Sequence, residues 1–173
     1  MKIPSPQDVA KAASECAFGQ PLVTNVYRSQ LVEAIMSMAL DDGWEWCASD
    51  YNAWDFQHVE GAKLEVKQSA ARQTWQAGAR GYSPPRFDIR QRKARWEGAT
   101  RILETGRYAD LYVFAWHPVT DDTADHRDAS QWRFFVVPTI SLPATSSIGL
   151  PALERLGGAV SFSELGARVT STI

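Results

Sequence analysis

At 173 residues, the chain is long enough for one domain with its own hydrophobic core and too short for two of ordinary size. With 45% hydrophobic and 22% charged residues it has the composition of a globular protein, and no apolar run is as long as a membrane-spanning helix requires. Two isolated Cys and three scattered His argue against a structural zinc site and favour a reducing compartment. No apolar segment typical of a secretory signal follows the N-terminus. We therefore expect a single cytoplasmic domain over residues 1–173, without a membrane partner.

The charges are distributed unevenly along the chain. The net charge of −2 argues against a nucleic-acid-binding protein. Residues 63–107, however, hold eleven of the 18 Lys and Arg but only four of the 20 Asp and Glu. Because a polyanion responds to the local field and not to the mean charge, this stretch is a candidate binding surface. A solvated surface segment explains the same pattern equally well.

Two helices are predicted in the N-terminal part of the chain. The first covers about residues 8–17 and is ended by the Gly-Gln-Pro sequence at 19–21. The second begins at Asn25, a residue type that often caps helix N-termini, and runs to about Leu40. Its apolar residues form a stripe along one side, and the Asp-Asp-Gly sequence at 41–43 ends it.

Five strands are predicted to follow. Three short ones, at 44–48, 54–58 and 62–68, form a meander. Residues 109–116 and 131–137 are near-continuous apolar runs, which suit central strands covered on both faces.

The remaining segments are predicted to be loops and short helices. Residues 69–86 contain Gly and a Pro-Pro pair and predict a short helical turn followed by a long loop. A helix is expected around residues 97–104. The C-terminal part, from about residue 148 to residue 173, predicts two short helices at 150–156 and 162–169. The whole pattern indicates an α/β fold.

The segment from Trp54 to Lys67 predicts a β-hairpin whose turn fixes its register. The three-residue loop at 59–61 ends in Gly61, as expected for a type I turn followed by a bulge residue at positive φ. This loop pairs three sets of residues across the two strands: His58 with Ala62, Phe56 with Leu64, and Asp55 with Glu65.

Because side chains alternate along a strand, this register divides the hairpin into two faces. The apolar face is expected to hold Trp54, Phe56, Leu64 and Val66. The charged face is expected to hold Asp55, Glu65 and Lys67. Shifting the pairing by one residue would set charges among the apolar side chains, so the pattern itself favours this register.

The charged face has the composition of a magnesium site. Two carboxylates on neighbouring strands, about 4.5–5.5 Å apart at Cβ, repel each other, and a cation relieves the repulsion. Asp55 and Glu65, with the Val66 carbonyl as a third oxygen, match the ligands that Mg²⁺ prefers. A bound ion would polarise a phosphoryl oxygen and activate a water, while Lys67 stabilises charge on the phosphate. The alternative is a surface hairpin with an incidental Glu-Lys pair.

Asp55, nine intervening residues and then Glu65-Val66-Lys67 resemble the D-x(n)-(D/E)-x-K signature of the PD-(D/E)xK nucleases, the restriction-endonuclease-like superfamily. The predicted element order over about residues 22–137 is similar to that family's αβββαβ core, a central mixed sheet flanked by helices. The resemblance implies that Asp55 and Glu65 bind Mg²⁺, with Mn²⁺ as a substitute. It also implies that Lys67 assists phosphodiester hydrolysis.

The resemblance extends to two neighbouring positions and fails at two others. Some members add a glutamate from the first core helix, a place that Glu33 could fill as a metal ligand; a solvated helix face is the alternative. Others carry Gln after the Lys, as Gln68 does here. Trp54, however, stands where the signature has Pro, and Gly and Pro residues interrupt the helix expected before residue 109.

Polar and basic residues after Lys67 are candidates for substrate binding, because such groups contact nucleic-acid backbones irrespective of sequence. They are Gln68, Ser69, Arg72, Arg86, Arg90 and Arg92. Trp75 and Trp96 lie in the same stretch and could stack on unpaired bases, although a core position is the simpler explanation for each.

The sequence thus predicts a Mg²⁺-dependent endonuclease acting on nucleic acid, with DNA as the expected substrate. The alternative, from a different class, is a non-catalytic nucleic-acid-binding or interaction module on the same fold. The low overall charge and the irregular segment 69–107 favour this alternative. The sequence leaves open the strandedness of the substrate and the choice between monomer and homodimer.

Overall fold

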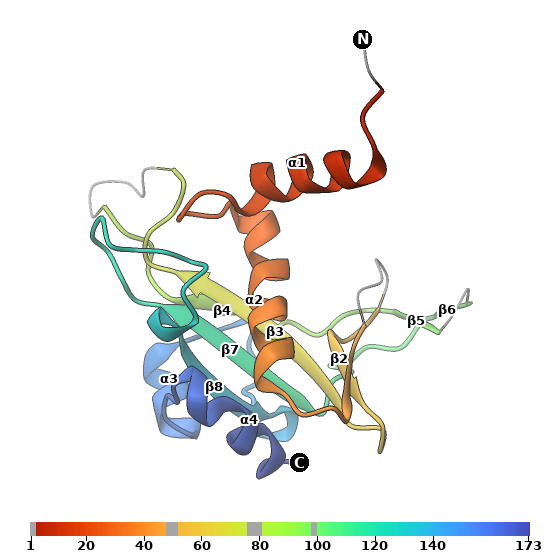
Figure 1. Cartoon of the computed structure of the whole chain (residues 1–173). Helices are drawn as coiled ribbons and strands as arrows, with labels where there is room; N and C mark the ends of the chain where they lie inside the picture. Colours follow the sequence, from red (N-terminus) through yellow and green to blue (C-terminus); the bar gives the residue numbers. More distant parts are fainter. Residues whose placement is uncertain (1–2, 48–51, 76–80, 98–99) are drawn as a thin grey trace.

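The computed structural model of the protein describes residues 3–47, 52–75, 81–97 and 100–173. Its centre is a five-stranded mixed sheet with helices on both faces, as the sequence predicts (Figure 1). The strands, in spatial order, are β1 (Trp44–Trp46), β2 (Phe56–His58), β3 (Lys63–Ala70), β7 (Leu111–His117) and β8 (Arg133–Pro138). β3 and β7 run parallel, and the other neighbouring pairs are antiparallel.

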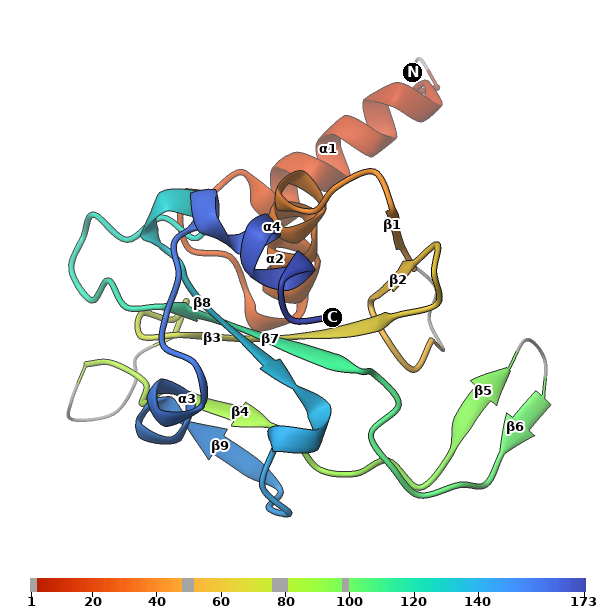
Figure 2. The same cartoon turned by 90° about the horizontal axis from the view of Figure 1, so that it is seen from below.

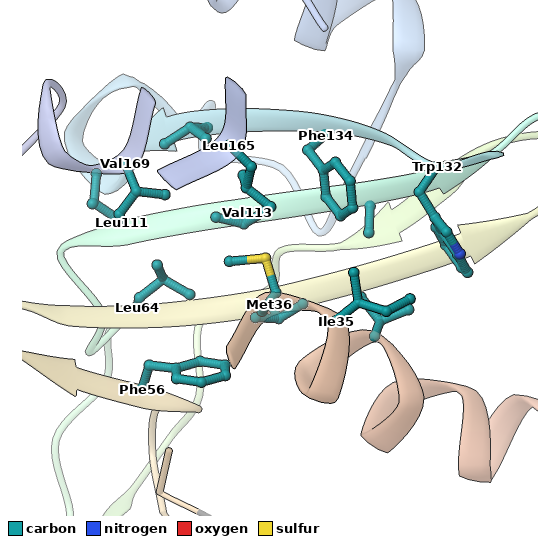
Figure 3. Close-up of a cluster of buried hydrophobic side chains, with 14 of the residues drawn as sticks. Ile35, Met36, Phe56, Leu64, Leu111, Val113, Trp132, Phe134, Leu165 and Val169 are labelled. Carbon is teal, nitrogen blue, oxygen red and sulfur yellow. The ribbon is translucent and has the colours of Figure 1, made fainter. Parts of the chain in front are cut away.

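The central strand β7 is buried at every position, and its side chains alternate between two hydrophobic cores. Leu111, Val113 and Ala115 belong to the first core (Figure 3). Tyr112, Phe114 and Trp116 belong to the second. The near-continuous apolar run in the sequence is therefore the signature of a strand covered on both sides.

Different elements cover the two faces of the sheet. Helices α2 (Asn25–Ala39) and α4 (Phe162–Thr170) lie on the first face. Helix α3 (Leu150–Leu156) and a two-stranded sheet of β4 (Arg86–Asp88) and β9 (Ser147–Gly149) lie on the second (Figure 2). This confirms the predicted C-terminal helices.

Helix α1 (Pro6–Phe18) lies outside both cores, and none of its residues is buried. It begins with a capping box, in which the Ser5 hydroxyl accepts from the Asp8 N–H and the Asp8 carboxylate accepts from the Ser5 N–H. It touches α2 through an edge-to-face contact of Phe18 with Tyr27. No helix within the described residues is long and apolar enough to cross a membrane.

The segment between β3 and β7 differs most from expectation. The predicted helix at 97–104 is wrong, because β5 (Arg95–Glu97) and β6 (Thr100–Ile102) form a hairpin that projects from the body (Figure 2). Backbone hydrogen bonds of 2.9 Å in both directions between Arg92 and Gly106 close the base of this arm. Cross-strand pairing outweighs a short helical pattern with little apolar periodicity.

Two smaller expectations also fail. No helical turn forms within residues 69–75, because β3 continues to Ala70 and residues 71–75 are irregular; the part of the prediction that falls on residues 76–80 lies outside the described residues. Asn25 is not a helix cap. Thr24 precedes α2 as its N-cap, while the Asn25 side chain accepts a 2.8 Å hydrogen bond from Arg28.

Buried His126 fastens three distant segments together. Its Nδ1 accepts a hydrogen bond from the Val23 N–H at 3.0 Å, and its Nε2 donates to the Arg72 carbonyl at 3.2 Å. Burial, followed by the nearby Arg28 charge, lowers its pKa to about 4. Because the folded state resists protonation, His126 stabilises the fold fully above the ordinary histidine pKa of about 6.5. This stabilisation is lost as the pH falls toward 4.

We expect His126→Gln to lose the pH dependence that this residue contributes. At neutral pH the wild type should be more stable than the variant, and the difference should shrink by up to about 3 kcal/mol between pH 6.5 and pH 4. Urea unfolding of both proteins across this range measures the difference directly. Parallel stability curves would contradict the assignment.

Candidate functional site

The predicted hairpin forms with the predicted register. Gly61 ends the loop at a φ of +96°. The His58 N–H donates to the Ala62 carbonyl at 2.8 Å, and Phe56 pairs with Leu64. The local sequence therefore sets the strand pairing that brings the acidic residues together.

Trp54 corrects the predicted division of faces. Phe56, Leu64 and Val66 face the first core as expected, but Trp54 packs against the second. There the Lys63 Nζ lies 4.2 Å from the centre of its ring. β2 begins only at Phe56 and residues 53–55 form a bend, so the alternation of a strand does not extend to Trp54.

Asp55 is held by the backbone of β3. Its N–H donates to the Leu64 carbonyl at 2.9 Å, and its Oδ2 accepts from the Val66 N–H at 2.6 Å. Asp55 thus takes the place that a further residue of β2 would occupy. In a strand, the N–H and C=O of one residue point to the same side, so the Val66 carbonyl also points toward this edge.

Glu65 is the buried acid of the site, with only 3% of its surface exposed. It lies in register with Tyr112 of β7. Its Oε1 accepts hydrogen bonds from the Lys67 ammonium and, at 2.8 Å, from the Arg92 guanidinium. Its Oε2 is equally buried and has no hydrogen-bond partner among the described residues. A buried carboxylate oxygen without a donor is energetically unfavourable, and a cation or a donor from outside the chain would relieve this cost.

The charged groups beside Glu65 line a cavity of about 190 Å³. Lys67 and Arg92 line it, together with Tyr112 and the Asp88–Arg90 pair, whose charged atoms are 3.0 Å apart. The site is therefore open to a small ion and to solvent. Because Arg90 and Arg92 each pair with an acid of this cavity, their charges act at the site and not on a distant surface.

Burial, and after it the negative charge of Glu65, raises the pKa values of two groups in the site. The pKa of Asp55 is raised to about 7, first by burial and then by the neighbouring Glu65, although the Val66 N–H opposes the shift. Burial and Glu65 raise the pKa of Tyr112 to about 12. A cation that entered the site would relieve both causes by pairing with the carboxylates.

Glu33 lies at the margin of the site and not on a solvated helix face. Its Oε2 accepts a 2.9 Å hydrogen bond from the Trp46 indole N–H. Burial raises its pKa, and Glu65 adds to the shift, so these acids lie within electrostatic range of each other. α2 thus contributes a third carboxyl to the neighbourhood.

The oxygen atoms at this edge fit a magnesium ion that keeps several waters. They are the two carboxylates of Asp55 and Glu65 and the Val66 carbonyl. Mg²⁺ typically takes one or two carboxylates and completes its shell with water. No group of three His, Cys, Asp or Glu side chains within the described ranges is arranged to hold a metal, so Asp55, Glu65 and Glu33 do not together form a three-carboxylate metal site in this conformation.

The remaining predicted substrate residues fall into two groups. Arg72 pairs with Asp122 at 2.5 Å and lies away from the carboxylates. Gln68, Ser69 and Arg86 line a second, larger cavity that adjoins the site. Gln68 accepts a 2.7 Å hydrogen bond from Arg28 at its floor.

Arg28 is a buried charge that the sequence interpretation missed. The signal was present, since Arg28 lies one helical turn before Val32 on the face of α2 that also carries Ile35. An arginine in an apolar stripe at helical spacing predicts a buried cation with several partners. Tyr112 was also not predicted as a site residue, because it lies within the apolar run of β7.

Comparison with known proteins adds no family assignment. No protein-family model matches the sequence, and no curated protein matches it.

The Asp55 pKa yields a stability test. Because this pKa is raised above the ordinary value of 3.8, ionisation of Asp55 progressively destabilises the fold as the pH rises from about 4 to above 7. Asn at position 55 can still accept from the Val66 N–H but carries no charge. We therefore expect Asp55→Asn to match the wild type near pH 4 and to exceed it by about 1–4 kcal/mol near pH 8, measured by urea unfolding without divalent ions. If the difference in unfolding free energy between Asp55→Asn and the wild type does not change with pH, the pKa of Asp55 is not raised.

Proposed function

We propose that the protein is a Mg²⁺-dependent nuclease that hydrolyses phosphodiester bonds in nucleic acid, with DNA as the expected substrate. The observation that supports this most strongly is the buried, unpartnered Oε2 of Glu65, which lies within electrostatic range of Asp55, a carboxyl whose pKa is raised. Two acids held together against their mutual repulsion, with an ammonium at one of them, are the composition of a metal-assisted phosphodiester hydrolysis site.

Each residue has a distinct role in this proposal. Asp55 and Glu65 would hold Mg²⁺ with the Val66 carbonyl. When bound, the ion supplies Lewis-acid polarisation of the phosphodiester and a water of lowered pKa. Lys67, which bonds Glu65 in the resting site, would turn to the scissile phosphate and stabilise its charge. Arg92 is a second cation on the same Glu65 oxygen. It also lines the cavity, from where it would contact the phosphate.

The topology supports a restriction-endonuclease-like core, although not in every element. A helix, an antiparallel meander and a parallel pair of β3 with a later strand occur in the order that the resemblance implies. The described part of residues 71–110 contains β4, β5 and β6 where that core has a crossover helix. The proposal therefore rests on the site and not on the connecting segment.

One observation favours the alternative, a nucleic-acid-binding module without catalysis. Lys67 and Arg92 already neutralise Glu65 in the absence of a metal. If these pairs persist when nucleic acid binds, the site is a structural ion-pair cluster. Binding without cleavage in either Mg²⁺ or Mn²⁺ would distinguish this alternative from the nuclease.

We expect Asp55→Ala and Lys67→Ala each to lower the cleavage rate at least about 100-fold, because each removes a group that acts on the reacting phosphate. The assay is cleavage of labelled single-stranded and duplex DNA and RNA in Mg²⁺, in Mn²⁺ and in EDTA. Glu60→Ala and Lys11→Ala are matched controls, since both residues are exposed and remote from the site. Equal cleavage by the Asp55 and Lys67 variants and the parent would refute the nuclease proposal.

Metal binding can be tested without catalysis. We expect Mn²⁺ to raise the melting temperature of the parent but not that of Glu65→Gln, because the ion binds the folded site alone. Asp55 must lose its proton to bind the ion. The Mn²⁺-induced rise in melting temperature should therefore become smaller as the pH falls below about 7. An equal, pH-independent shift in both proteins would indicate that Mn²⁺ binds elsewhere.

A further inference from the structure

A groove of about 420 Å³ runs from the carboxylate site along an unpaired edge of β3. β2 pairs with β3 only as far as Leu64, and beyond it no strand of the described chain covers this edge. The N-terminal turn of α2 forms one wall of the groove, and β4 forms the other. Lys67 and Asp88 line both this groove and the Glu65 cavity, so the two spaces adjoin.

The floor of the groove contains a buried cation without an acidic partner. Arg28 is 1% exposed, and its guanidinium donates to neutral oxygens of Gln68, Gln73 and Asn25 at 2.7–2.9 Å. No carboxylate of the described residues forms an ion pair with it. Burial lowers its pKa to about 10, which leaves it charged at neutral pH. An uncompensated buried charge is unfavourable in the free protein, and an anion in the groove would relieve it.

Two further features add positive potential to the groove. The N-cap residue Thr24 makes no side-chain capping hydrogen bond, and the first turn of α2, which lines the groove, carries the positive end of the helix dipole. Arg86 lies on the opposite wall and is exposed, with a 3.0 Å hydrogen bond to the Ser147 hydroxyl. The groove lining thus carries three basic side chains, Arg28, Lys67 and Arg86, against one acid, Asp88, so the groove is electropositive although the protein as a whole is acidic.

The lining offers a flat aromatic surface on a rigid floor. Trp75 lines the groove and keeps 53% of its surface exposed. The amide groups of Gln68 and Gln73 are already hydrogen-bonded to Asn25 and to the Ala70 carbonyl, so they hold the floor in place. An exposed indole in an electropositive groove suits a base that is not paired, because only an unpaired base presents its face for stacking.

We propose that this groove binds single-stranded nucleic acid, with an unpaired base stacked on Trp75 and the chain leading past Lys67 to the carboxylate site. This inference rests on the proposed nuclease function, since it names the form of substrate that the same site would cut. A peptide strand added to the β3 edge is the competing occupant. It would not require Trp75 or the buried cation.

The test is binding in EDTA, which separates recognition from cleavage. Fluorescence anisotropy of a labelled oligonucleotide of about 20 nucleotides, single-stranded or as a duplex, gives both affinities. We expect tighter binding of the single strand, a loss of about tenfold or more in Trp75→Ala, and near-parental affinity in Trp75→Phe, which keeps a stacking face. Trp96→Ala is the matched control, since Trp96 lies on the projecting hairpin and does not line the groove.

Arg86→Ala provides an independent readout. If Arg86 contacts a phosphate, its removal should weaken binding and lower the slope of log affinity against log salt by about one. Circular dichroism checks that each variant folds. The groove proposal is overturned if Trp75→Ala binds the single strand as tightly as the parent, or if the parent prefers the duplex.

The two proposals can fail separately. Metal-dependent cleavage together with single-strand binding that is unchanged in Trp75→Ala would overturn the groove inference and leave the nuclease standing. Single-strand binding that depends on Trp75, with no cleavage in any metal, would overturn the nuclease and support the groove as a binding site.

Discussion

The burial of Glu65 is the constraint on which the site depends. Its carboxylate enters the interior because β3 lies between β2 and β7, and the side chain points to the face that also carries Tyr112. A buried carboxylate is unfavourable unless cations or donors surround it, and here Lys67 and Arg92 both pair with a single oxygen. The second oxygen lacks a donor, so the compensation is incomplete. Much of the chemistry of the site follows from this imbalance.

The neighbouring acid adds to the same imbalance. Asp55 is fixed by the Val66 backbone in a buried position where Glu65 repels it, and its pKa is raised first by this burial and then by the repulsion. A protein selected only for stability would replace one of these acids by a neutral residue. If the proposed cation binds here, stability that the two acids cost in the free protein would be recovered in the complex.

The sequence predicted the parts of this structure that depend on local chemistry. The position of Gly61 fixed the hairpin register, and the apolar runs indicated the buried strands β7 and β8. The face of Trp54 could not be predicted in this way, because a bend outside the strand decides it. The pairing of Arg92 with Glu65 was equally inaccessible, since it joins residues of an irregular segment and a strand through tertiary packing alone. The β5–β6 hairpin was not predicted, because its residues lack the alternation of apolar and polar side chains that indicates a strand.

The parallel pairing of β3 with β7 also has a consequence for how the protein folds. Asp110 fastens the start of this pair to Lys63, 47 residues earlier in the chain, through bonds of 2.9 Å from the Lys63 N–H and 2.8 Å to the Lys63 carbonyl. The hairpin contact between Asp55 and Val66 spans only 11 residues and can form rapidly on its own. Closing the longer loop is entropically slower, so we expect the two acids to meet in water before β7 docks and removes Glu65 from solvent. Folding thereby postpones the electrostatic penalty until the hydrophobic collapse that offsets it.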